Sequence, residues 1–202
     1  MNDPAIQAQA MLYQDANLRA VAELENLIDQ HPGVAILYGY LGIALILGGQ
    51  EEEAQTTWAM AVLESSDTEL EQYSQQLSDL LYQEAQHQVN LGNLETAWTL
   101  RQHLREINRS DCLNLLHLIW LSAQLHLPVD RAYLLDISQG IESQAEADLA
   151  TLGLEMLPIL EKIQPLACLE SWLPELFEAC LTALQPLAAL HLLMRTATEV
   201  AY

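Results

Sequence analysis

The amino-acid sequence predicts an all-α protein made of stacked antiparallel helical hairpins, with about ten or eleven helices and no strand. Three observations support this prediction. Leu, Ala, Gln and Glu, which favour helices, dominate the composition. The eight Gly and seven Pro residues stand mostly between segments with helical periodicity. Apolar residues make up 51% of the chain and charged residues 17%, proportions that exclude disorder.

The first helices are separated by clear stop and start signals. Residues 14–33 are typical of the second helix of a hairpin. Val34 to Leu47 is almost wholly apolar, but this run is shorter than the roughly 20 residues that cross a bilayer, so it predicts a buried core helix. Gly49 breaks the chain, and Glu51 to Glu53 favour the start of the next helix because carboxylates interact well with a helix N-terminus.

The helical pattern continues after Asp111, which we expect to cap the next helix. Cys112 to Leu127 is apolar on all sides and predicts a buried helix. We expect Gly140 to end the following short helix and Pro158 to kink or split the one after it. The predicted segments after Leu127 are 131–141, 143–163, 169–184 and 186–200.

One group of residues resembles the tetratricopeptide repeat (TPR), which has a period of 34 residues and the pattern W-x2-L-G-x2-Y followed by A-x3-F. Small residues in this pattern let two helices approach closely, and large ones fill the space beside them. The matching residues are Tyr38, Leu41, Gly42, Leu45, Ala54, Trp58 and Ala61. One period earlier, Ala8, Ala20, Leu24 and Pro32 stand at equivalent positions.

A third repeat follows with a longer spacing. Gly92 and Ala97 repeat the spacing of Gly49 and Ala54, but Gly92 comes 43 residues after Gly49. About nine additional residues therefore lengthen a loop or the first helix of this repeat, near residues 65–73. Arg101 replaces the large aromatic residue, so the third repeat is degenerate. We predict three TPR-like repeats in residues 1–111. Residues 112–202 are expected to continue the array or to form a bundle packed on it, cut off before a following domain.

A second resemblance covers about residues 1–127. The runs "LGIALILGGQEEEAQTTWAMAVLE" and "AWTLRQHLREINRSDCLNLLHLIWLSAQL" resemble the N-terminal helical region of cyanobacterial SPINDLY-like proteins, which are related to O-linked N-acetylglucosamine transferases. The resemblance implies a non-catalytic helical region that precedes a glycosyltransferase domain. The wider family holds peptides with a ladder of Asn residues. Ile6, Tyr40 and Gln83 stand at those positions here, so this mode of binding is not expected.

The charge of the chain restricts its partners. The net charge is −21, and between Arg19 and Arg101 there are 13 acidic residues and no Lys or Arg. Nucleic acids and anionic membranes would be repelled, whereas a basic protein or peptide would be attracted. A soluble acidic surface without a partner explains the same charge.

Cys112, Cys168 and Cys180 form no C-x-x-C pair and indicate buried thiols in a reducing, cytoplasmic setting. The N-terminus does not resemble a signal peptide.

The repeat register predicts which residues line a concave partner-binding face. These are Gln9, Leu12, Tyr13, Ile36, Ile43, Ile46, Tyr82, Gln86, Val89 and Asn90. The apolar middle of this face would accept a peptide, be covered by the C-terminal helices, or mediate self-association into a homo-oligomer. Arg101, Arg105 and Arg109 are spaced to form one helical stripe, which would bind an anionic group of a partner or pair with neighbouring acids.

We find no catalytic motif in the sequence. The six His residues show no metal-ligand spacing, and His117 is expected in the core. No G-K-[ST] follows Gly48 and Gly49, so they form no phosphate loop. The sequence predicts no cofactor and no enzyme activity in this chain. It predicts a protein-interaction module or, alternatively, the acceptor-recruiting or dimerising arm of a glycosyltransferase.

Overall fold

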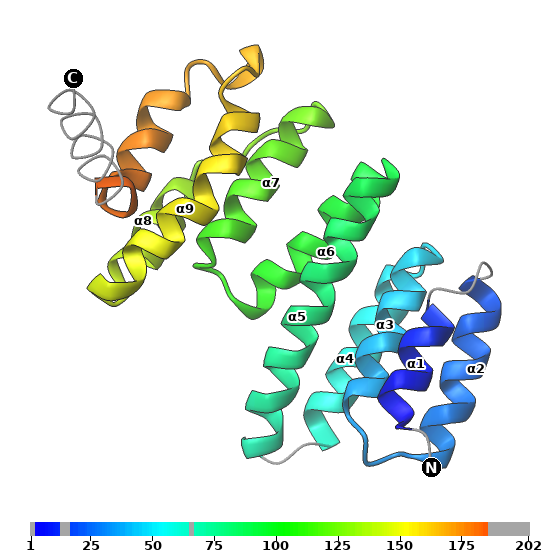
Figure 1. Ribbon diagram of the computed structural model, residues 1–202. Helices are drawn as coiled ribbons and strands as arrows, with labels where there is room; N and C mark the ends of the chain where they lie inside the picture. The colour runs from blue at the N-terminus through cyan, green and yellow to red at the C-terminus, as the bar shows by residue number, and fades with distance from the viewer. Residues whose placement is uncertain (1–2, 13–16, 65–66, 186–202) are drawn as a thin grey trace, which may run out of the picture. The chain divides into compact units, whose positions relative to one another are not determined.

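The computed structural model describes residues 3–12, 17–64 and 67–185. The described residues form α-helices and one short 3-10 helix, in agreement with the predicted all-α class (Figure 1). The chain divides into two compact units, residues 1–107 and 108–202. The segment predicted as a last helix, 186–200, lies outside the described residues.

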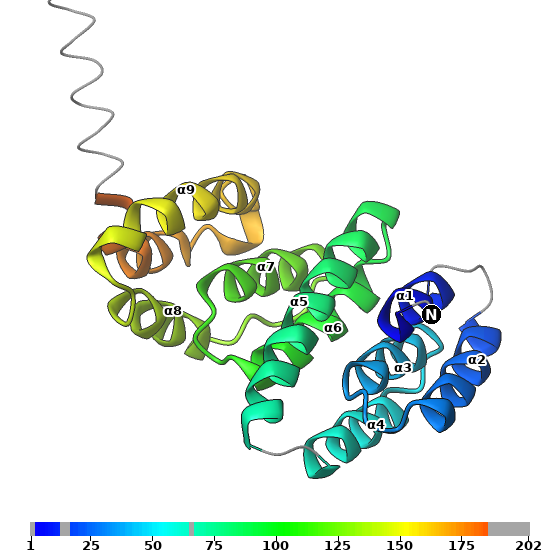
Figure 2. The same cartoon turned by 60° about the horizontal axis from the view of Figure 1, so that its bottom comes forward.

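Unit 1 contains three helical hairpins. In each hairpin the two consecutive helices contact one another, and the helix α3 of the middle hairpin also contacts α1, α2, α5 and α6. Figure 2 shows α3 lying among α1, α2 and α4. The helices are α1 (Pro4–Leu12), α2 (Asn17–Gln30), α3 (Ile36–Leu47), α4 (Glu51–Glu64), α5 (Asp67–Leu91) and α6 (Leu94–Ile107).

The core of unit 1 confirms that the run Val34 to Leu47 contains a buried helix. Ten of the twelve residues of α3 are buried, and this helix has no charged side chain. Gly49 lies in the turn between α3 and α4 and has a φ of 77°. Gly92 has a φ of 82° at the equivalent turn of the third hairpin. Both turns use the left-handed conformation that glycine adopts without strain. No helix in the described part of the chain is long and apolar enough to span a bilayer.

The contact between α3 and α4 explains the small and large residues of the predicted repeat. A Cβ atom at Gly42 would overlap the indole ring of Trp58. The Trp58 Nε1 atom donates a hydrogen bond of 3.3 Å to the Gly39 carbonyl oxygen, so the indole bridges the two helices. Ala54 on α4 is completely buried. The absence of a side chain at Gly42 therefore provides the space in which Trp58 packs.

The described part of unit 2 contains α7 (Cys112–Gln124), α8 (Ala132–Glu142), α9 (Glu146–Ile163), a 3-10 helix (Ala167–Leu169) and a helix over 173–185. The helix α7 contacts both α8 and α9. Asp111 caps α7 as predicted, because its carboxylate accepts a hydrogen bond of 3.0 Å from the backbone amide of Asn114. Pro158 lies inside α9, which continues past it without being split.

The expectation that Gly140 ends a helix was wrong, because α8 continues to Glu142. Gly140 is buried at a close approach instead. A Cβ atom there would overlap the Ser110 carbonyl oxygen and would lie 2.7 Å from Cys112 Sγ. The glycine is therefore needed for packing of α8 on the start of α7, not for a turn.

Candidate functional site

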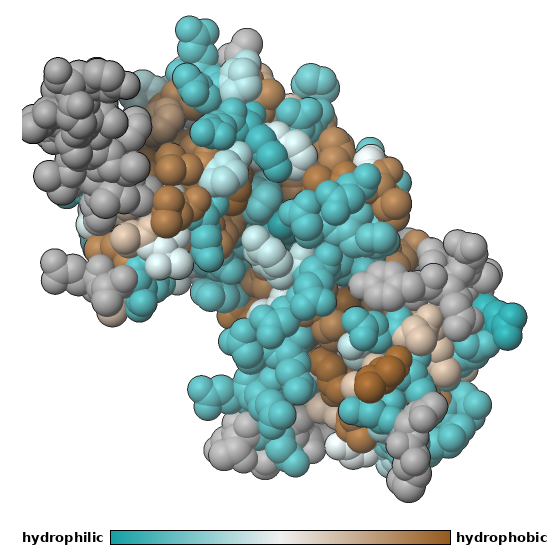
Figure 3. Space-filling model, viewed as in Figure 1, coloured by the Kyte–Doolittle hydropathy of each residue, from teal (hydrophilic) through white to brown (hydrophobic). Residues whose placement is uncertain are grey.

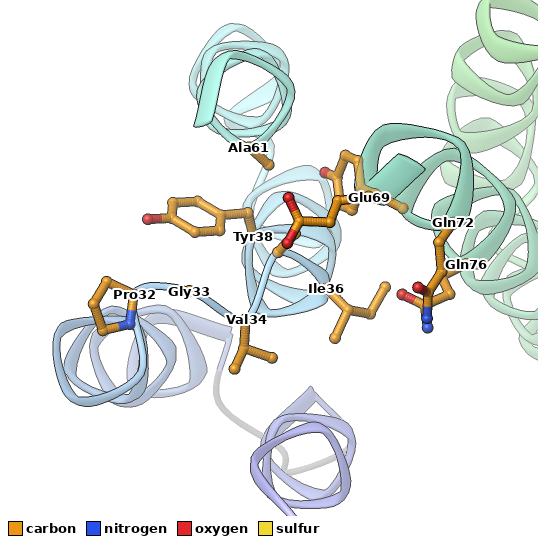
Figure 4. Close-up of a pocket in the computed structure, with 11 residues that line it drawn as sticks. Pro32, Gly33, Val34, Ile36, Tyr38, Ala61, Glu69, Gln72 and Gln76 are labelled. Atoms are coloured by element: carbon orange, nitrogen blue, oxygen red, sulfur yellow. The ribbon is translucent and has the colours of Figure 1, made fainter. Parts of the chain in front are cut away.

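A cavity of about 370 Å³ lies between the turn before α3 and the first turns of α5, and we call it the α3–α5 cavity (Figure 4). One wall is apolar and the other carries polar side chains of α5. In Figure 4 the Glu69 carboxyl group reaches from α5 toward Tyr38, and the side chains of Gln76 and Ile36 approach one another. The lining residues are Pro32, Gly33, Val34, Ala35, Ile36, Tyr38, Ala61, Glu69, Gln72, Tyr73 and Gln76.

The unusual length of α5 builds the polar wall of this cavity. The helix has 25 residues, whereas the other helices of unit 1 have between 9 and 14. Glu69, Gln72 and Tyr73 belong to the stretch where the sequence predicts about nine additional residues. The structure places residues 67–73 in a helix, not in a loop. The insertion therefore supplies Glu69, Gln72 and Tyr73 to the polar wall, and Gln76 follows it on the same helix.

The turn between α2 and α3 builds the opposite wall. The His31 amide donates to the carbonyl oxygen of Leu27 at 3.0 Å, and the Val34 amide donates to that of His31 at 3.1 Å. Pro32 lies between them, where its missing amide proton and fixed φ are tolerated. These hydrogen bonds hold the turn in a compact form and bring Pro32, Val34 and Ile36 to one side of the cavity.

Tyr73 lines this cavity and also a second one. Its side chain is 2% exposed, and its hydroxyl has no hydrogen-bond partner among the described residues. Burial raises the pKa of Tyr73 strongly, because the phenolate would be poorly solvated. Tyr73 thus contributes a nearly buried side chain with a polar hydroxyl to the lining of both cavities.

The second cavity, which we call the α4–α6 cavity, has a volume of about 340 Å³. His103 of α6 forms part of its wall and is 3% exposed. Its Nδ1 lies 3.2 Å from Glu106 Oε2, its Nε2 lies 3.1 Å from Glu51 Oε1, and its ring meets the Trp58 ring edge-on at 5.2 Å. The contacts of His103 with Glu51 and Trp58 tie α6 to α4. The other lining residues are Gln55, Ala59, Val62, Tyr73, Ser74, Leu77 and Ile107.

The residues predicted for a concave face are only partly accessible. Leu12, Ile43 and Ile46 are buried in the core of unit 1, where they would not contact a partner. They are covered because α3 is packed between α1, α5 and their neighbours. Tyr13 lies outside the described residues. The members that stay exposed or half-buried are Gln9, Ile36, Tyr82, Gln86, Val89 and Asn90, and Ile36 also lines the α3–α5 cavity.

The three arginines predicted as one stripe do not share a surface. Arg101 is completely buried, with its guanidinium 4.8 Å from the centre of the Tyr82 ring, so it is not accessible to bind an anionic group of a partner. Arg105 is half-buried on the same helix. Arg109 lies beyond the end of α6 and pairs within unit 2 with Asp136, at 3.1 and 3.2 Å.

Two of the three cysteines and His117 lie in the core. Cys112 and Cys180 are buried free thiols as predicted, but Cys168 is exposed. Burial raises the pKa of Cys112 to about 11 and that of Cys180 to about 12, which makes both thiols poor nucleophiles. His117 is buried in α7, as predicted. Within the part of the chain that the structure describes, His, Cys, Asp and Glu form no group of three suited to a metal ion.

Comparison of the chain with models of known protein families, with curated proteins and with solved structures found no significant match. The features of the chain that bear on its function are therefore its cavities and its charge.

Proposed function

We propose that this chain is a non-catalytic, tetratricopeptide-like interaction module that binds a short segment of another protein in the α3–α5 cavity. The observation that carries the proposal is the two-sided lining of this cavity. Pro32, Val34 and Ile36 provide an apolar wall, and Glu69 and Gln76 provide hydrogen-bonding groups opposite it. A bound segment needs both, since apolar contacts give affinity and polar groups fix its orientation.

The helical hairpins of unit 1 support the same proposal. Helical repeat arrays display binding residues on a rigid scaffold, and the core around α3 provides such a scaffold here. On the face shown in Figure 3, hydrophilic side chains cover α5, and hydrophobic ones lie beside them. The resemblance to SPINDLY-like proteins leads to a narrower hypothesis, in which the bound segment belongs to a glycosyltransferase acceptor.

A pull-down with matched variants tests the proposal. Gln76→Trp places a bulky side chain in the cavity, whereas Gln75→Trp changes a neighbouring exposed residue that does not line it. The partners retained by the wild-type chain and by Gln75→Trp, but lost by Gln76→Trp, would be those that use the cavity. The proposal would be overturned if all three chains retained the same proteins, or if the wild-type chain retained none.

A further inference from the structure

We infer that the α3–α5 cavity takes a Lys or Arg side chain of the bound segment together with an adjacent apolar residue, and that Glu69 pairs with the cation. This inference rests on the proposed function, because it names the chemistry of the segment bound in the same cavity. It concerns the part of the cavity that the additional residues of α5 create.

The charge around the cavity favours a cationic ligand. All lining residues come from the stretch between Arg19 and Arg101, which has 13 acidic residues and no Lys or Arg. Glu69 is the one ionised side chain among the described lining residues. A carboxylate offers about four lone-pair sites, so Glu69 can accept from a ligand in addition to the contacts it makes within the protein. An anionic ligand would meet only repulsion here.

The apolar wall fits the rest of such a segment. The aliphatic stem of Lys or Arg packs on apolar surface while its charged end stays near a polar group. Pro32, Val34 and Ile36 provide this surface opposite the polar side chains of α5. The amide groups of Gln72 and Gln76 can donate to and accept from the backbone of an extended segment.

The size of the cavity also favours a short segment. Its volume of about 370 Å³ is at the small end of the roughly 300–1,000 Å³ that small-molecule pockets occupy. It has room for a side chain with part of the neighbouring residue and little room for a large cofactor. The specificity of the site therefore lies in one ion pair and one apolar contact.

A displayed library of random short peptides, selected on the wild-type chain and read by sequencing, tests the inference. We expect enrichment of peptides in which Lys or Arg stands beside Leu, Ile, Val, Met or Phe. The affinity of an enriched peptide should fall about tenfold in Glu69→Gln and further in Glu69→Lys, and it should weaken as the salt concentration rises. Glu71→Lys, an exposed residue of α5 outside the cavity, should bind the peptide with at most a small loss.

The outcomes separate this inference from the proposed function. Enriched peptides without a basic residue, lost in Gln76→Trp but kept in Glu69→Lys, would overturn the inference and leave the proposed function intact. An equal loss in Glu69→Lys and Glu71→Lys would assign the effect to net charge and would also overturn it. A dimer of the wild-type chain that dissociates in Gln76→Trp would assign the cavity to a second copy, against the inference. Far-UV circular dichroism and thermal unfolding establish that each variant is folded.

Discussion

Replacing Gly42 with Ala tests the contact on which the middle hairpin depends. The added methyl group would overlap Nε1 and Cε2 of Trp58 and would lie 2.8 Å from its Cδ1. Trp58 is 8% exposed and is held by its hydrogen bond to the Gly39 carbonyl oxygen. The indole must therefore move, or α3 and α4 must separate, before the methyl group fits.

The size of the effect follows from three contributions. Overpacking costs about 2 kcal/mol, and loss of the buried Trp58 hydrogen bond costs about 1 kcal/mol more. The higher helix propensity of Ala returns about 1 kcal/mol. We therefore expect Gly42→Ala to lower the free energy of unfolding by about 2 kcal/mol. Urea unfolding followed by circular dichroism at the helical band measures this difference.

Two matched variants make the test specific. Gly39→Ala, on the same helix, would place its methyl group 3.3 Å from Ile36 Cδ1 and 3.5 Å from a Cδ1 atom of each of two leucines, all at the ends of flexible side chains. It should change the stability by less than about 1 kcal/mol. In a Trp58→Leu background, Gly42→Ala should cost little, because the overlapping ring is gone. Equal stability of Gly42→Ala and Gly39→Ala, or an equal cost of Gly42→Ala in both backgrounds, would refute the reasoning.

Three further predictions concern buried polar groups. Tyr73→Phe should leave the stability unchanged or raise it by about 1 kcal/mol in urea unfolding, because the lost hydroxyl has no partner among the described residues; a loss above 1 kcal/mol would contradict this. The raised pKa values of Cys112 and Cys180 mean that the folded state keeps protons that the unfolded state loses above about pH 9. Stability should therefore fall as the pH rises from 9 toward 11, by about 1.4 kcal/mol per pH unit for each thiol, and more gently in Cys180→Ala. Asp136→Asn should cost about 1–3 kcal/mol because a neutral amide replaces the buried carboxylate that pairs with Arg109. Arg131→Gln, which breaks an exposed ion pair, should cost less than about 1 kcal/mol in the same assay.

The parts of the fold that local rules determine were predictable from the sequence. Gly49 and Gly92 adopt positive φ values at hairpin turns, and Asp111 caps α7, because these conformations depend on the residue and its immediate neighbours. The packing of Gly42 against Trp58 was expected because residue spacing in a repeat fixes which side chains meet.

The parts that depend on packing between helices were not predictable. Arg101 is buried because Tyr82 of α5 covers its guanidinium, and no spacing within α6 indicates this. Gly140 continues α8 because the backbone at Ser110 approaches it. One sequence feature is related to the α3–α5 cavity, namely the 43-residue spacing between Gly49 and Gly92. That spacing indicated additional residues but not the surface that they would form.

The central position of α3 affects how unit 1 opens. All five other helices of the unit contact α3, so no hairpin can detach without uncovering part of it. Amide hydrogens of α3 should therefore exchange with solvent only when residues 1–107 unfold together, whereas the exposed turns between helices exchange through local fluctuations. Because α3 carries no charged side chain, the opened state exposes an apolar segment that readily associates with other chains. Cooperative unfolding of this unit thus protects the molecule from aggregation.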